Sequence, residues 1–243
     1  MSAIYDTIGI NYSDLRRPDP RIGASIQAAL GGAQRIINVG AGAGSYEPTD
    51  REVLAIEPSS EMISQRPESA APVIQAQAEA IPLDDDSYDA AMAILTIHHW
   101  ADKAQGLSEM RRVATGPIVL LTYDPAFRGF WLADYLPELI TQDEGVMPTM
   151  GQFEDWLGPV EISEVPVPFD CSDGFLYAYW RRPAAYLDEE VRKAISAFWA
   201  LGDVTSALDQ LRDDLESGAW EARYGRLMEL DSLDCGYRLV RTL

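Results

Sequence analysis

The chain has 243 residues, of which 47% are apolar, so it is long enough to bury a sizeable core and too apolar to be mostly disordered. Its formal net charge is −20, and residues 123–243 hold 23 acidic against 10 basic side chains, compared with 16 against 9 in residues 1–122. This negative field should repel polyanions, which argues against nucleic acid or an anionic membrane surface as a partner.

The first predicted element is a helix that begins near Pro20. Asp19 can accept hydrogen bonds from its first N–H groups, and proline is favoured in a first helical turn. The apolar residues of this segment recur at helical spacing, as Ile22, Ile26, Ala29 and Leu30. Strands and helices then alternate, with strands predicted at residues 36–39, 53–57, 73–76, 90–95 and 118–122, and helices at 59–65 and 102–113.

The strand at 118–122 is a continuous apolar run, which is typical of parallel strands covered on both faces. The alternation predicts an α/β fold with a doubly wound, mostly parallel sheet. Beyond it we predict helices at 129–140 and 150–157, a strand at 160–165 and a last strand at 236–240. A helical insertion at 171–234 precedes that last strand, clearest at 184–202 and 204–215, and a single domain spans 1–243.

A glycine loop follows the first predicted strand. Gly40, Gly42 and Gly44 alternate with alanine, and the next strand ends at Glu57. Glycines let the backbone approach a ligand, and a carboxylate at a strand end can bind ribose hydroxyls. Dinucleotide sites place a full crossover helix after the glycines, but the eight residues between Gly44 and Val53 allow at most about two helical turns. A cofactor without pyrophosphate therefore suits the site better.

This pattern resembles motif I of class I S-adenosylmethionine-dependent methyltransferases, at residues 37–44 (INVGAGAG). Residues 55–59 (AIEPS) resemble the acidic strand end of that family, and further segments at 75–83, 87–100 and 109–113 follow in the family's order. The resemblance covers roughly residues 5–125. It implies a Rossmann-like, seven-stranded sheet with an antiparallel last strand, an insertion that covers the site and selects the substrate, and S-adenosyl-L-methionine as cofactor.

The resemblance also implies contacts with the cofactor. Glu57 would accept hydrogen bonds from the ribose hydroxyls, and Pro58 and Leu95 would sandwich the adenine. The backbone of the glycine loop, at Gly40, Gly42 and Gly44, would meet the methionyl ammonium and carboxylate.

Further cofactor contacts are expected at Gln77, which departs from the family pattern, and at the start of the chain. Gln77 stands where the family usually has Asp, and its carbonyl could accept from the adenine amino group while the Ala78 N–H donates to a ring nitrogen. Alternatively, Gln77 is a solvated surface residue. Tyr12 and Arg16 resemble residues that fold over the cofactor from an N-terminal segment, here 1–18, with packing of a terminal helix as the alternative.

His98 and His99 are the only histidines, and they follow the fourth predicted strand, where ligands bind in open α/β sheets. Either could accept a proton from the substrate during methylation. Substrate contact and a structural role are the alternatives. Tyr123, Tyr179 and Trp180 are candidate substrate contacts, although the aromatic residues of the insertion could equally form its own core.

Methyl transfer from a sulfonium is an in-line displacement that depends on alignment and a dry cavity more than on strong acid–base groups. We therefore predict a small-molecule methyltransferase with a neutral or cationic acceptor. The alternatives are a nicotinamide-dependent oxidoreductase and a non-catalytic module that binds a protein partner. Cys171 and Cys235 are too scattered for a zinc site or disulfide framework, so no metal is expected. The sequence shows neither a secretory leader nor a membrane-spanning apolar run, and we expect a cytoplasmic protein. It does not determine the oligomeric state.

Overall fold

Seven strands form one sheet in the order β3-β2-β1-β4-β5-β9-β6 in the computed structural model, which describes residues 16–243. Neighbouring strands from β3 to β5 run parallel, whereas β9 runs antiparallel to both β5 and β6. The strands are β1 (Arg35–Val39), β2 (Glu52–Ile56), β3 (Val73–Ile74), β4 (Ala90–Ile94), β5 (Ile118–Tyr123), β6 (Val160–Glu164) and β9 (Tyr237–Thr242). This is the doubly wound α/β sheet that the sequence predicts.

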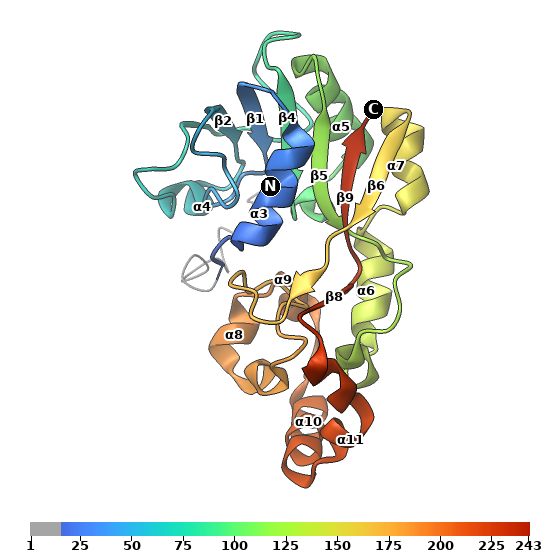
Figure 1. Cartoon of the computed structure of the whole chain (residues 1–243). Helices are drawn as coiled ribbons and strands as arrows, with labels where there is room; N and C mark the ends of the chain where they lie inside the picture. Colours follow the sequence, from blue (N-terminus) through green and yellow to red (C-terminus); the bar gives the residue numbers. More distant parts are fainter. Residues whose placement is uncertain (1–15) are drawn as a thin grey trace.

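Helices cover both faces of the sheet (Figure 1). On one face, α3 (Pro20–Leu30) packs its buried side chains against Ile36 of β1 and Leu121 of β5. On the other face, α5 (Lys103–Val113) and α7 (Met150–Leu157) pack against Ile37 and Leu120, the neighbours that point the opposite way. The short helix α4 (Ser60–Ser64) follows β2. The predicted start of α3 is confirmed, because the Asp19 side chain accepts from the Arg21 N–H.

A mostly helical segment separates β6 from β9 and lies at the end of the sheet where the parallel strands have their carboxyl ends (Figure 1). The elements between β6 and β9 are β7 (Val167–Pro168), η3 (Pro183–Leu187), α8 (Glu189–Lys193), α9 (Ser196–Ala200), α10 (Thr205–Ser217), α11 (Ala219–Tyr224), η4 (Gly225–Glu229) and β8 (Ser232–Leu233). The strands β7 and β8 pair as a two-stranded antiparallel ribbon, which the sequence did not predict. Residues 16–243 contain no helix both long and apolar enough to span a bilayer.

Two predicted helices are wrong in their extent. The helix expected at 129–140 is a 3-10 turn, η2 (Trp131–Asp134), followed by α6 (Glu138–Val146). Pro137 lies between them and has no N–H with which to continue a preceding helix. The helix expected at 184–202 is broken into η3, α8 and α9, because the Asp188 side chain accepts from the Glu190 N–H and begins a new helix.

Candidate active site

The glycine loop leaves the carboxyl end of β1 in a left-handed conformation. Gly40, Gly42 and Gly44 have φ angles of 69°, 52° and 94°. A Cβ atom added to Gly40 would lie 2.2 Å from Oγ1 of Thr96, so the loop passes directly over the residues that follow β4. The N–H groups of Gly40 and Ala41 donate to the Ile56 carbonyl at 2.8 and 3.0 Å. The loop is therefore held at the ends of both β1 and β2, with no side chain on three of its five residues.

Glu57 joins this loop to the start of α4. Its Oε2 accepts from the Gly42 N–H at 2.7 Å, and its Oε1 accepts from the Ser59 N–H at 2.8 Å. The residue is 5% exposed. The hydrogen bonds to ribose hydroxyls that the sequence predicts for Glu57 stay a prediction.

A buried ion pair, which the sequence did not predict, holds the glycine loop through a hydrogen bond to its backbone. Arg66 donates to both carboxylate oxygens of Glu47 at 2.8 and 2.9 Å and to the Gly42 carbonyl at 3.0 Å. Glu47 also accepts from the Asn38 amide and the Ala71 N–H. The two charged side chains are only 5% and 6% exposed. No local motif marks the pair, because the partners are 19 residues apart and meet only in the fold.

The residues predicted to sandwich the adenine follow β2 and β4, the two strands on either side of β1. Pro58 and Leu95 are both half-buried, and Leu95 adopts a φ of 52°, which is rare for a residue with a side chain. Such outliers gather at functional sites because the surrounding structure must hold them. Gln77 is exposed, in keeping with the solvated alternative, while Ala78 is buried against α5.

His98 and His99 lie in the 3-10 turn η1 (Ile97–His99), directly after β4. Their ring centroids are 3.8 Å apart. Burial lowers the pKa of His98 well below its usual value, and the neighbouring His99, Lys103 and Arg16 lower it further. Burial also lowers the pKa of His99, to about 4, with smaller contributions from the positive charges of Lys103 and Arg16. Both imidazoles are therefore neutral at pH 7 and are weak bases.

Arg16, Tyr123 and Tyr179 are further predicted site residues that the structure describes. The Arg16 Nε donates to Asp173 at 2.5 Å, and its expected contact with the methionyl carboxylate stays a prediction. Tyr12 lies outside the described residues. Tyr179 is buried, with the Arg182 guanidinium over its ring. Tyr123 is also buried, with its ring centroid 5.3 Å from that of Tyr177.

Trp180 is the clearest case of the core alternative. It is fully buried, and its indole N–H donates to the Val167 carbonyl at 3.0 Å. The substrate contact predicted for Trp180 therefore has no exposed surface to support it. For Tyr123 and Tyr179, substrate contact stays a prediction.

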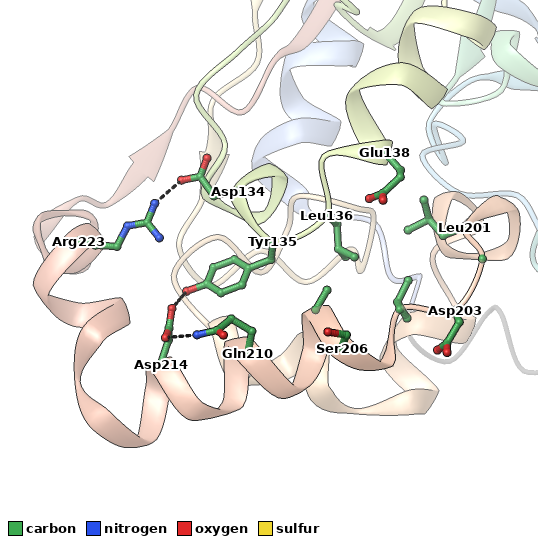
Figure 2. A pocket seen from close by; sticks show the side chains of 13 residues that line it. Asp134, Tyr135, Leu136, Glu138, Leu201, Asp203, Ser206, Gln210, Asp214 and Arg223 are labelled. Atoms are coloured by element: carbon green, nitrogen blue, oxygen red, sulfur yellow. Dashed lines mark hydrogen bonds and ion pairs between the residues drawn. The ribbon is translucent and has the colours of Figure 1, made fainter.

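A separate cavity of about 750 Å³ lies within the C-terminal half (Figure 2). It is formed between the start of α6, the segment before α10, and α10 itself, where Tyr135 donates to Asp214 at 2.7 Å. Its lining includes none of the described residues predicted for the site. Within residues 16–243, no group of three or more His, Cys, Asp or Glu side chains is placed to hold a metal ion.

Comparison with known proteins places this geometry in a family. Residues 37–116 match the family model of a methyltransferase domain. A solved structure from Anabaena variabilis, named as a candidate methyltransferase from an antibiotic biosynthesis pathway, is 35% identical and superposes with a TM-score of 0.87 over 94% of this chain and 99% of that chain. The chain belongs to the S-adenosylmethionine-dependent methyltransferases.

Other methyltransferases share parts of the chain or the fold alone. The ubiquinone/menaquinone biosynthesis C-methyltransferase of Geobacter sp. (strain M21) is 31% identical over 134 residues, 45% of this chain. The match spans 57% of that relative's length. A methyltransferase structure from Thermotoga maritima has a TM-score of 0.59 over 99% of this chain and 98% of that chain, and at 14% identity it supports the fold only.

The family's cofactor is S-adenosylmethionine, and the residues present fit it. At Gly40 a side chain would collide with Thr96, so the loop offers bare backbone where the family binds the methionyl group. The carboxylate of Glu57 stands beside that loop.

Proposed function

We propose that this protein methylates a small molecule by in-line transfer from S-adenosylmethionine. The observation that carries the proposal is the 2.7 Å contact between the Gly42 N–H and the Glu57 carboxylate, which brings backbone and acid together at the carboxyl ends of β1 and β2. His98 and His99 follow β4, the strand next to β1. Cofactor and acceptor would thus meet along one edge of the sheet.

The chain's own residues would bind and orient both reactants. The cofactor supplies a methyl group activated by its sulfonium. Glu57 would accept from the ribose hydroxyls, while Pro58 and Leu95 would flank the adenine and the Ala78 N–H would donate to its ring. Gly40, Gly42 and Gly44 would expose backbone to the methionyl group, with Arg16 facing its carboxylate.

The two histidines would serve as hydrogen-bond or proton acceptors for the substrate. The acceptor atom would form its bond to the methyl carbon as the carbon–sulfur bond breaks, and a proton lost by the acceptor would pass to His98 or His99. With a pKa of about 4, His99 is a weak base. It would therefore act only as the acceptor atom becomes acidic during transfer, and alignment would supply most of the rate enhancement.

The acceptor is proposed to be neutral or cationic, because residues 123–243 carry 23 acidic and only 10 basic side chains. The insertion at 171–234 is proposed to cover the site within a single domain, with the segment 1–18 closing over the cofactor. Tyr123 and Tyr179 are the proposed substrate contacts. The Geobacter relative is named as a C-methyltransferase of a quinone pathway, which supports a small organic acceptor.

Isothermal titration with S-adenosylhomocysteine tests the proposal. Wild-type protein should bind, and Glu57→Ala should weaken binding about tenfold or more, because charge-assisted hydrogen bonds contribute about 1.5–3 kcal/mol. Glu52→Ala is the matched control, since Glu52 is an exposed glutamate at the other end of β2. Equal affinity in wild type and Glu57→Ala would contradict the cofactor assignment. If the cofactor binds but no acceptor is methylated in a broad screen, the non-catalytic module would be the better description.

A further inference from the structure

Three segments far apart in the sequence meet at one buried carboxylate, Asp173, whose side chain is 1% exposed. Its Oδ1 accepts from the Arg16 Nε at 2.5 Å, and its Oδ2 accepts from the Tyr46 hydroxyl at 2.9 Å. Arg16 and Asp173 also form an isolated antiparallel β-bridge. We call Arg16, Tyr46 and Asp173 the Asp173 junction.

Tyr46 connects the junction to the cofactor loop. It follows Gly44 by two residues, is buried, and adopts a φ of 64°, a conformation that residues with side chains rarely take. Its hydroxyl accepts from the Asp19 N–H at 3.3 Å while it donates to Asp173. Both hydrogen-bonding functions of the phenol are therefore used, and the contacts hold the end of the loop in an otherwise unfavourable conformation.

Arg16 connects the junction to the edge where the histidines lie. Its side chain is 11% exposed, and its positive charge contributes to the lowered pKa values of both His98 and His99. Asp173, at the beginning of the insertion, is therefore a buried carboxylate that helps to hold this charge beside the carboxyl end of β4. Removing one carboxylate from a buried ion pair is strongly destabilising, so Arg16 should be held less firmly in this place when Asp173 is replaced.

We propose that Asp173 is a positioning residue for the cofactor site, which fixes Arg16 at the edge of the sheet and, through Tyr46, fixes the end of the glycine loop. Through these contacts Asp173, which lies in the insertion, links Arg16 to the end of the glycine loop. This inference rests on the proposed function, because it takes the glycine loop and Arg16 as cofactor contacts.

Two variants and one control test the junction by titration with S-adenosylhomocysteine. Asp173→Asn should raise Kd about tenfold or more, and Tyr46→Phe, which removes one neutral hydroxyl, about two- to tenfold. Asp170→Asn is the control, because it removes the same charge three residues away, where Asp170 is exposed and pairs with Arg21. It should change Kd less than about twofold.

Limited trypsin digestion supplies a readout that a general loss of stability would not produce. The bond between Arg16 and Arg17 is a potential cleavage site, whereas the next bond precedes Pro18. S-adenosylhomocysteine should slow cleavage between Arg16 and Arg17 in wild type and Asp170→Asn. In Asp173→Asn the same saturating ligand should give no protection, even where thermal unfolding shows a folded sheet.

The outcomes separate the two proposals. If wild type binds S-adenosylhomocysteine but Asp173→Asn and Tyr46→Phe bind it within twofold of wild type, the junction has no positioning role while the proposed function stands. Ligand-dependent protection that is absent in wild type, or retained in Asp173→Asn, also overturns the inference. If wild type fails to bind, the proposed function fails and the junction's role falls with it. Tyr46→Phe decides the question alone if Asp173→Asn does not fold.

Discussion

Replacing Gly40 with alanine measures how closely the glycine loop approaches the end of β4. The added Cβ would lie 2.2 Å from Oγ1 and 2.8 Å from Cγ2 of Thr96, on a residue whose φ is 69°. A left-handed conformation costs an L-residue about 1–2 kcal/mol, and forced overpacking adds about 1–3 kcal/mol. We therefore expect Gly40→Ala to lower the free energy of unfolding by about 2–5 kcal/mol. It should also weaken S-adenosylhomocysteine binding, because the loop or Thr96 must move.

Gly218 offers the matched control. It joins α10 to α11 with a φ of 80°, and an added Cβ would meet no atom within 4 Å. Gly218→Ala should therefore lose only the conformational contribution of about 1–2 kcal/mol. Urea unfolding followed by circular dichroism gives both values. The close approach is refuted if Gly40→Ala is as stable as Gly218→Ala. In the double variant Gly40→Ala, Thr96→Ala the two shortest contacts disappear, and part of the lost stability should return.

Two further predictions concern buried charges. Glu47→Gln breaks the buried pair with Arg66 and should lower the free energy of unfolding, measured in urea, by about 3–5 kcal/mol. As a control, Asp209→Asn breaks an exposed pair with Arg212 and should lower it by about 1 kcal/mol or less. Equal losses would show that Glu47 is more solvated than the structure places it. Burial raises the pKa of Asp143 from 3.8 to about 7, so its contribution to stability is present below pH 4 and is lost as the pH rises through 7. The stability of Asp143→Asn relative to wild type should therefore increase between pH 4 and 8, by about 4 kcal/mol at most. Thermal unfolding of both proteins across this pH range measures the effect. A difference in Tm between them that does not change with pH would contradict the prediction.

Local patterns in the sequence determined the framework of this protein. The cap at Asp19, the apolar strands and the glycine loop each depend on residues within a few positions of one another, so periodicity and turn chemistry identify them without a fold. The acid at position 57 could be placed beside the loop because consecutive parallel strands end at the same edge of a sheet. The family resemblance rested on these same segments.

Contacts between distant segments were decided only by the tertiary structure. Glu47 and Arg66, and likewise Arg16 and Asp173, are ordinary charged residues in the sequence, and 157 positions separate the second pair. Whether Arg16 meets Asp173 depends on the path of the chain from the sheet into the insertion, and no local pattern encodes that path. The burial of Trp180 followed the same rule, because an aromatic residue packs equally well in a core or against a ligand, and only the surrounding chain determines which.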